Sequence, residues 1–300
     1  MSIWVLRGLR DGIVTTRWPR RPDEYADSWR GPVTVTRDPA RLDSSRLDST
    51  QLDSARLVDR EMSGAEGATT FPDISGNRSA DSGLPEIAVL CPTGAIEAVG
   101  RPGPGKLRVD QGRCILCGRC VAARPDLFAW SAGATGPASA AVARQALVVP
   151  DEPETAEAVA AARAALAART TAMRRSVHVR HVDAGSDGSE EWEIQALLGP
   201  VYDVHRLGVF FTASPRHADV LLVTGAGTVG MAGPLRTTYE GMPDPKVVIA
   251  VGTDAVSGGL LSDRLTGVDG TVPVDVWVQG SPPSPFAILN ALLIATGKLR

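Results

Sequence analysis

From residue 176 to the C-terminus, the apolar positions alternate between strand-like and helix-like spacing. Short runs rich in valine, isoleucine and leucine predict buried strands over SVHVRHV (176–182), LGVFFTA (207–213), ADVLLVT (218–224), KVVIAVG (246–252) and VPVDVWV (272–278). The segments between and after them predict helices over EWEIQALLG (191–199), GPLRTTYEGM (233–242) and SPFAILNALLIATG (284–297). Such continuously apolar strands, separated by helices, indicate a flavodoxin-like α/β domain over 176–300, with its parallel sheet covered on both faces.

The chain before residue 176 divides into four stretches of different composition. Residues 1–35 are apolar and basic, and we expect them to lie along a membrane or partner surface. Residues 36–83 carry RLDSS, RLDST, QLDSA and RLVDR in succession, which predicts a disordered linker because four short copies cannot bury a core. Residues 84–150 contain all four cysteines. Residues 151–175 begin with acids and end with arginines around an alanine-rich middle, which predicts a connecting helix.

Overall composition narrows the class of protein. The chain is 43% hydrophobic and 22% charged, so most of it can bury a core, and its formal net charge of −3 gives no case for nucleic-acid binding. The longest apolar run, AILNALLIA (287–295), is far shorter than the roughly 20 residues that span a bilayer. The N-terminus lacks a signal-peptide pattern, so we expect a cytoplasmic chain. One apolar face of a helix, for a membrane surface or for ordinary docking, is predicted from Ile3, Trp4, Leu6, Leu9 and Ile13.

The cysteines follow the spacing of a ferredoxin. The segment RCILCGRCVAARP (113–125) gives Cys114-x-x-Cys117-x-x-Cys120, then three residues and Arg124-Pro125. Bacterial ferredoxins carry C-x₂-C-x₂-C-x₃-C-P, in which the fourth cysteine binds the other cluster. Here Arg124 stands at that fourth position, and LCPTGAI (90–96) keeps only the Cys91-Pro92 end of a first run.

This pattern predicts a ferredoxin-like α+β domain over 84–150 with one [4Fe–4S] cluster. Its ligands would be Cys91, Cys114, Cys117 and Cys120, and no cysteine remains for a second cluster. Two alternatives stay open at this point. Three close cysteines and a distant one could bind zinc, and disulfides are possible in an oxidising compartment.

The first part of the chain resembles the ferredoxin-type subunits of respiratory complex I and of membrane-bound group 4 [NiFe] hydrogenases. The resemblance covers residues 1–35 and 84–130, and LRDGIVTTRWPRRPDEYADSWRGPV (9–33) is similar to their N-terminal segment, which lies against the membrane arm. Those subunits usually hold two clusters, whereas one is expected here.

Residues 174–300 resemble the small cluster-bearing subunit of the same complexes. The resemblance is carried by RRSVHVRHVDAGS, EWEIQALLGPVYDVHRLGVFFTASPRHADVLLVTG, MPDPKVVIAVGT and PPSPFAILNALL. It implies cluster-binding cysteines at four places where this chain has Asp187, Glu190, Asp254 and Ser281. Carboxylates and a hydroxyl do not replace four soft thiolates, so we expect no cluster in the C-terminal domain.

This degenerate site has two interpretations. The polar side chains could solvate an emptied pocket, or three converging carboxylates could bind a hard cation or a proton.

A second motif, Gly225-Ala-Gly227-Thr-Val-Gly230, matches G-x-G-x-x-G. Because Pro234 prefers a first helical turn, the next helix is predicted to begin after the motif, too late to meet a nucleotide phosphate. His178 and His181 lie three apart on a strand and should face opposite sides, while His205 and His217 are isolated; hydrogen-bonded structural roles are expected for all four.

Together the two resemblances imply a fusion of neighbouring subunits of a membrane-associated oxidoreductase complex related to complex I and group 4 hydrogenases. The implied partners are a large 49 kDa-like subunit and membrane-arm subunits, with quinone as a candidate acceptor, and the implied location is peripheral on the inner face of the cell membrane. The chain is not expected to be catalytic alone. Two hypotheses follow: electron transfer through the N-terminal cluster, or a structural and coupling role in a complex that has lost its redox relay.

Overall fold

The computed structural model of this protein describes residues 7–36 (without residue 9), 88–99, 106–133, 139–150, 153–173 and 176–299. The predicted linker over 36–83 lies outside the described residues except for residue 36. Four residues of the predicted N-terminal apolar face also lie outside them, namely Ile3, Trp4, Leu6 and Leu9.

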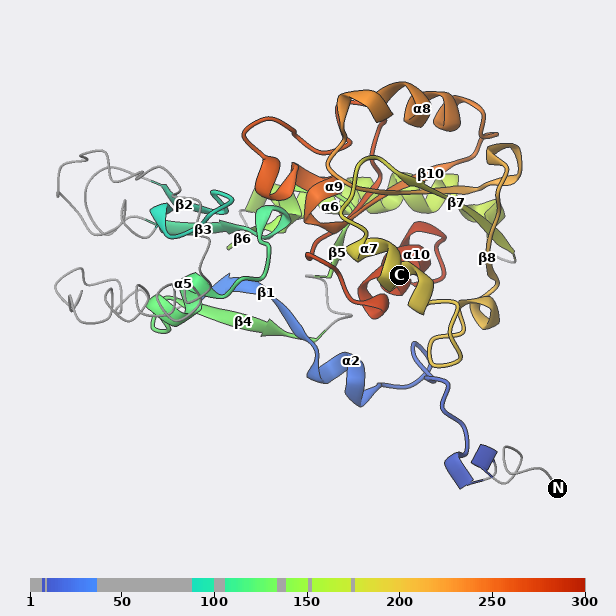
Figure 1. Ribbon diagram of the computed structural model, residues 1–300, viewed down its shortest axis with the longest axis horizontal. Coiled ribbons are helices and arrows are strands. Elements are labelled where there is room, and N and C mark those ends of the chain that lie inside the picture. Colours follow the sequence, from blue (N-terminus) through green and yellow to red (C-terminus); the bar gives the residue numbers. More distant parts are fainter. Residues whose placement is uncertain are drawn as a thin grey trace, which may run out of the picture.

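A six-stranded sheet forms the centre of the C-terminal domain (Figure 1). Its order is β5-β11-β10-β9-β7-β8, and all neighbours pair in parallel except β5, which is antiparallel to β11. The five parallel strands therefore have the 2-1-3-4-5 order of flavodoxin-like folds, which confirms the predicted parallel sheet. The strands are β5 (Ala140–Ala141), β7 (Val177–Asp183), β8 (Val209–Phe211), β9 (Val220–Thr224), β10 (Val247–Val251) and β11 (Val276–Val278).

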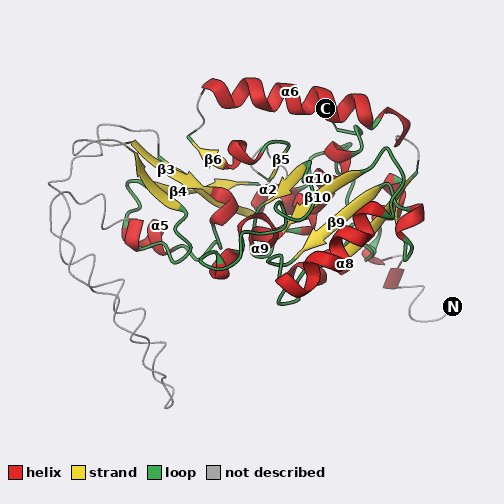
Figure 2. Ribbon diagram, turned by 90° about the horizontal axis from the view of Figure 1, so that it is seen from above, coloured by secondary structure: helices red, strands yellow, loops and turns green. Residues whose placement is uncertain are grey.

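Helices cover both faces of this sheet. Successive strand residues point to opposite sides, so strands that are apolar at every position present apolar side chains on both faces. Val247 and Ile249 of β10 pack with helices α6 (Pro153–Arg169), α7 (Ser189–Ala196) and α10 (Pro285–Ala295), while Val248 and Ala250 pack with α8 (Val229–Glu240) and α9 (Gly252–Ser257). Figure 2 shows α6 and α8 on opposite sides of the strands. The alanine-rich segment predicted as a connecting helix is α6.

Helix α10 explains the most apolar run of the sequence. Ser284 is its N-cap, and the Ser284 hydroxyl accepts the N–H of Ala287 at 3.2 Å, while Pro285 occupies the first turn. Its residues from Pro285 to Leu293 are all buried, so a helix apolar on every side is an internal one. Neither α10 nor any other helix in the described part of the chain is long and apolar enough to cross a bilayer.

The cysteine-bearing part is built from two small antiparallel sheets (Figure 1). One is β1 (Arg30–Val35) with β4 (Phe128–Ala132), and the other is β2 (Ile96–Val99), β3 (Lys106–Asp110) and β6 (Val148–Val149). Helices α2 (Glu24–Ser28) and α5 (Arg119–Ala123) complete it.

The predicted segment boundaries do not coincide with the boundaries between these sheets. Strand β1 comes from the segment predicted over 1–35, yet it pairs with β4 beside the cysteines. Strand β5 comes from the segment predicted over 84–150, yet it extends the C-terminal sheet. A short strand needs a partner for its backbone groups, and here that partner is distant in sequence.

Helix α8 corrects one prediction. It begins at Val229, with Thr228 as its N-cap, and so contains both Gly230 and Pro234. The helix was predicted over 233–242, after the glycine motif, whereas it opens within that motif. A proline within a helix deprives the carbonyl four residues earlier of its hydrogen bond. That carbonyl belongs to Gly230, which is exposed, so water can take the place of the missing donor.

The first two glycines of the motif, which precede α8, are explained by close packing of backbone. Gly225 has φ of +82°, and a Cβ there would lie 2.5 Å from the backbone of Gly185 and Ser186. Gly227 has φ of +74°, and a Cβ there would lie 2.3 Å from the carbonyl oxygen of Gly267. Both positions therefore require glycine for the loops to meet.

We predict that Gly225→Ala lowers the free energy of unfolding by about 2–4 kcal/mol, because it adds strain at a positive φ and a clash with backbone. The measurement is thermal or urea unfolding. Gly230→Ala is the matched control within the same motif, since a Cβ there meets nothing within 4 Å. Equal stability of the two variants would show that the motif is not held by packing.

Candidate functional site

All four predicted cluster ligands line one pocket. Cys91 follows a short turn, Cys114 follows the 3₁₀ helix η3 (Gln111–Arg113), Cys117 lies in the next loop, and Cys120 lies in α5. The remaining lining is largely apolar, with Val33, Ala95, Ile96 and Val109 among its residues. Two segments separated in the sequence thus bring four thiols to a single site.

The loop from Cys114 to Cys120 turns twice through left-handed backbone. Leu116 has φ of +58° and Gly118 has φ of +74°. At Gly118 a Cβ would lie 2.9 Å from Cζ2 of Trp130, so the glycine also allows the loop to lie against that ring. These turns curl the loop around the pocket.

Backbone N–H groups point at the sulfur atoms. The N–H of Ala95 donates to Sγ of Cys91 at 3.2 Å, Leu116 and Val33 donate to Cys114, and Val121 donates to Cys120. Such donors stabilise anionic sulfur and are one means by which proteins tune iron–sulfur clusters.

Burial disfavours free thiolates in this pocket. Desolvation raises the pKa of Cys114, and it raises the pKa of Cys120 to about 12, with the neighbouring cysteines adding to both shifts. Thiolates in such a place need compensating positive charge, which the iron of a cluster would supply. The donor set and its surroundings therefore fit a [4Fe–4S] cluster.

The cysteines are not arranged around a single ion in the described part of the chain. Among the residues that the structure describes, no three histidine, cysteine, aspartate or glutamate side chains are arranged to hold one metal ion. In a cluster each thiolate binds a different iron, so the sulfurs stand farther apart than around one ion.

Arg124, at the position of the missing fourth cysteine, forms a bidentate ion pair with Asp126 at 2.8 and 2.6 Å.

The degenerate site lies at the carboxyl ends of the parallel strands. Asp187 and Glu190 follow β7, Asp254 follows β10, and Ser281 follows β11. In open parallel sheets, ligand sites form at this edge. The structure brings the three carboxylates close enough for Asp254 and Asp187 to raise the pKa of Glu190 by repulsion.

Glu190 is the buried member of this group. Its side chain is 0% exposed, and its Oε1 has no hydrogen-bond partner among the described residues. That oxygen lies against Gly252, where φ is +93° and a Cβ would be 2.4 Å away. Burial, followed by repulsion from Asp254 and Asp187, raises the pKa of Glu190 to about 7.

The other two carboxylates have different surroundings. Asp187 is exposed, and its Oδ1 accepts the hydroxyl of Ser189 at 2.6 Å and the N–H of Ser189 at 2.9 Å, which lowers its pKa. Burial, with repulsion from Asp187, raises the pKa of Asp254. Three similar side chains thus differ in how readily they lose a proton.

A hydrogen-bonded network beside this site was not predicted. Nε2 of His181 lies 3.0 Å from the hydroxyl of Thr224, Thr224 donates to Glu191, and the hydroxyl of Ser186 donates to Glu191 at 2.8 Å. Burial lowers the pKa of His181. The adjacency of these groups depends on the β7–β9 pairing, which spacing along the sequence does not reveal.

His178 lies on the other side of β7 from this network. Its Nδ1 is 3.6 Å from a carboxylate oxygen of Asp219, and its ring lies beside Phe210, which also stacks on His205. His178 and His181 therefore have separate partners, as their spacing on the strand predicts.

One buried threonine joins the cysteine pocket to the degenerate site. The hydroxyl of Thr253 donates to the carbonyl of Cys114 at 3.0 Å and lies 3.3 Å from the N–H of Gly280. Its own N–H donates to the carbonyl of Gly280 at 2.8 Å. Thr253 precedes Asp254, and Gly280 precedes Ser281, so both sites share this contact.

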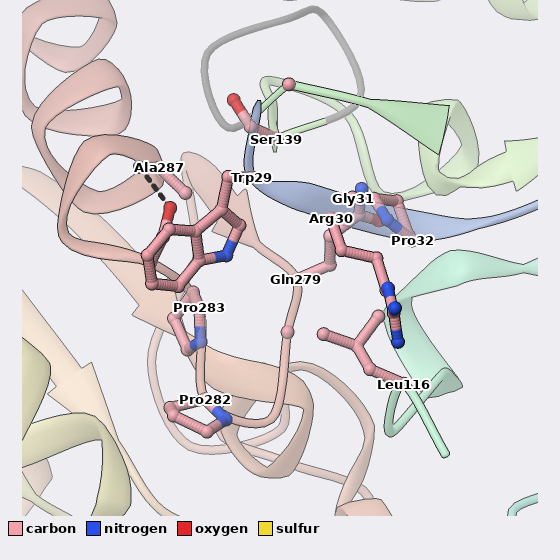
Figure 3. A pocket seen from close by; sticks show the side chains of 13 residues that line it. Trp29, Arg30, Gly31, Pro32, Leu116, Ser139, Gln279, Pro282, Pro283 and Ala287 are labelled. Atoms are coloured by element: carbon pink, nitrogen blue, oxygen red, sulfur yellow. Dashed lines mark hydrogen bonds between the residues drawn. The ribbon is translucent and has the colours of Figure 1, made fainter. Parts of the chain in front are cut away.

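A second pocket lies at the same junction (Figure 3). It is lined by Trp29 and Arg30 of the N-terminal segment, by Leu116 of the cysteine loop, and by Pro282 and Pro283 before α10. Gln279 also lines it, and Oε1 of that side chain is buried without a hydrogen-bond partner among the described residues.

Comparison with known proteins gives consistent relatives. Residues 188–295 match the family model described as NADH ubiquinone oxidoreductase, 20 Kd subunit. The chain is 42% identical over 130 residues to formate hydrogenlyase subunit 7 of Escherichia coli K12, covering 42% of this chain and 51% of that protein. It is 44% identical over 128 residues to the probable membrane-bound hydrogenase subunit mbhJ of Pyrococcus furiosus, covering 42% of this chain and 77% of that protein.

A third relative is a quinone oxidoreductase subunit. The chain is 45% identical over 105 residues to NAD(P)H-quinone oxidoreductase subunit K of a Picosynechococcus strain, covering 34% of this chain and 43% of that protein. The chain thus spans about half the length or less of two of these three relatives.

We predict that Glu190→Gln removes a pH dependence of stability. Because the folded-state pKa lies near 7 rather than at 4.5, the folded chain binds more protons than the unfolded chain between these values. The contribution of Glu190 to the free energy of unfolding is therefore full below pH 4.5. It falls as the pH rises to about 7, by an amount on the order of 3 kcal/mol.

The measurement is the melting temperature from pH 5 to 8, with the exposed Glu240→Gln as the control. We expect Glu190→Gln to melt higher than the unmodified chain at the upper end of this range and to show a flatter profile. A profile unchanged by Glu190→Gln would mean that Glu190 titrates normally.

Proposed function

Because the chain belongs to the NADH ubiquinone oxidoreductase 20 kDa subunit family, we propose that it is an electron-transferring subunit of a membrane-associated complex related to complex I and group 4 hydrogenases. The electron carrier would be one [4Fe–4S] cluster bound by Cys91, Cys114, Cys117 and Cys120 in a ferredoxin-like part of the chain. Such a cluster stores one electron at a time.

The observation that carries this proposal is the convergence of all four cysteines on one pocket. Cys91 is separated from the Cys114–Cys120 loop by strands β2 and β3, yet the antiparallel pairing of those strands returns the chain to the same place. Amide donors on three of the sulfurs and the left-handed turns at Leu116 and Gly118 support the same assignment.

The degenerate site does not continue an electron path in this proposal. Its side chains are hard oxygen ligands, which do not bind a cubane of iron and sulfide. An electron on the cysteine-bound cluster would therefore leave to an acceptor outside this chain, such as a cluster in a partner subunit or a quinone.

Exposed apolar side chains at the carboxyl end of the sheet support docking on a partner. Trp192 at the start of α7 is 77% exposed, and Val229 at the start of α8 is 87% exposed. Leu260 and Leu261, just after α9, are exposed as well. Large apolar groups exposed at one edge are typical of an interface. We propose that a large 49 kDa-like subunit covers this edge, and that membrane-arm subunits hold the complex on the inner face of the cell membrane.

We predict that the anaerobically reconstituted full chain binds about four iron atoms and shows one cluster signal in low-temperature EPR after reduction with dithionite. Cys117→Ala should abolish that signal, because three thiolates and a methyl group cannot complete the ligand set. Cys117 is exposed, so its substitution should leave the fold intact.

The control is Ser131→Ala on strand β4, which keeps all four cysteines. A signal that survives Cys117→Ala would contradict the ligand assignment. A chain that takes up no iron and sulfide under these conditions would contradict electron transfer and leave the structural role as the alternative.

The degenerate site gives a gain-of-function prediction. The combined variant Asp187→Cys, Glu190→Cys, Asp254→Cys and Ser281→Cys should bind a second cluster, about four more iron atoms per chain, because the scaffold still holds these positions at one edge of the sheet. EPR of the reduced variant and its iron content measure the result. The control is a variant with cysteine at only two of these four positions. An unchanged iron content in the fourfold variant would show that the pocket does not fit a cluster.

A further inference from the structure

The buried carboxyl group of Glu190 has a function to explain. Its side chain is fully buried, and Oε1 lies against Gly252 with no hydrogen-bond partner among the described residues. A charged carboxylate in such a place is strongly disfavoured, whereas a protonated carboxyl group is tolerated. The group is thus placed to hold a proton.

The hydroxyl of Ser189 gives a second, geometric indication. It has a single hydrogen, and it lies 2.6 Å from Oδ1 of Asp187 and 3.1 Å from Oε2 of Glu190. The shorter contact, to the ionised Asp187, takes that hydrogen. The contact with Glu190 is then a hydrogen bond only if the proton comes from Glu190.

These groups also form a route from solvent. Asp187 is exposed, Ser189 bridges it to Glu190, and Glu190 is buried. A proton can therefore reach the buried carboxyl group along hydrogen bonds that are already in place. Two of the four positions where the resemblance implies cluster ligands, Asp187 and Glu190, are the ends of this route.

The buried carboxyl group is also close to the cysteine pocket. Glu190 touches Gly252, and the next residue, Thr253, donates a hydrogen bond to the carbonyl of Cys114. The charged groups that act on Glu190 are Asp254 from α9 and Asp187 from its own turn, and both are negative. Added negative charge at Cys114 therefore favours a proton on Glu190, and no cation among these groups opposes it.

We propose that Glu190 binds a proton when an electron enters the cysteine pocket, so that the degenerate site compensates the charge of the neighbouring cluster. The inference rests on the proposed function. Near and above pH 7, a share of the oxidised chains holds Glu190 as the carboxylate. In those chains one electron from a low-potential donor, dithionite in the test, reduces the cluster, and one proton passes from solvent through Asp187 and Ser189 to the Glu190 carboxylate. The O–H bond of Glu190 forms, and no bond to sulfur or iron breaks.

The test is a redox titration of the reconstituted full chain, followed by EPR at a series of pH values on both sides of 7. The midpoint potential should fall as the pH rises, since an ionised Glu190 opposes reduction. The reduction constant should change by at most about tenfold for each pH unit, which corresponds to about 59 mV. Glu190→Gln should give a potential that does not depend on pH.

Two further variants make the outcome specific. Glu193→Gln, on the same helix but outside the carboxylate group, should keep the pH dependence. Asp254→Asn should move it to lower pH, because it removes a negative neighbour of Glu190, and this arm holds even where Glu190→Gln does not fold.

A pH-independent potential in the unmodified chain overturns the inference while leaving the proposed function in place. The same holds for a pH dependence that persists in Glu190→Gln, or one that Asp254→Asn leaves unmoved. A chain that binds no cluster instead contradicts the proposed function itself.

Discussion

The packing of η3 against the start of α9 holds the cysteine pocket and the parallel sheet in one arrangement. At its centre Thr253 is fully buried and bonds the carbonyl of Cys114, while Gly112 leaves no room for a Cβ between Val256 and Leu147. Beside it, Asp110 accepts two hydrogen bonds from Arg144 at 2.8 and 2.7 Å and caps η3 through the N–H of Gly112. Each buried hydrogen bond contributes only about 1 kcal/mol, yet leaving any of these groups unpaired costs more, so the contact fixes a single geometry.

This contact gives the C-terminal domain a role that does not need a cluster of its own. A loop with two left-handed residues, Leu116 and Gly118, has little regular structure to hold it. It is held instead by Thr253 behind Cys114 and by Gln279, whose amide group donates to the side chain of Gln111 in η3 at 3.3 Å. The parallel sheet therefore acts as a support for the cysteine pocket, and the proposed electron transfer would need the fixed distances that such a support gives.

The main sheet could be predicted because its information is local. Runs such as VLLVT and VVIAV are short, rich in valine and almost wholly apolar, which is typical of a strand buried on both faces. Strand β11 is shorter than predicted. The N–H of Asp275 still donates to the carbonyl of Val248 at 2.9 Å, but the N–H of Val248 donates to the Asp275 carboxylate at 2.8 Å. The predicted start of α8 was wrong because it relied on the preference of proline for the first helical turn. Pro234 is tolerated inside the helix, since the carbonyl of Gly230, which loses its hydrogen bond, is exposed to water. The pairings of β1 with β4 and of β5 with β11 join residues far apart in the chain, and no periodic pattern records them.

For the candidate site, the sequence indicated which residues matter but not how their surroundings differ. The spacing of the cysteines predicted a common pocket, and the structure brings them to one. The sequence does not distinguish the surroundings of the three acidic residues. In the fold Asp187 is exposed, Asp254 is half-buried, and Glu190 is buried against Gly252, which has φ of +93°. That glycine is the physical reason for the difference, because any side chain at position 252 would occupy the space that the Glu190 carboxyl group fills. At this place, where the resemblance implies thiolates, Glu190 is buried and its Oε1 has no hydrogen-bond partner among the described residues, which is the condition under which a carboxyl group keeps its proton near neutral pH.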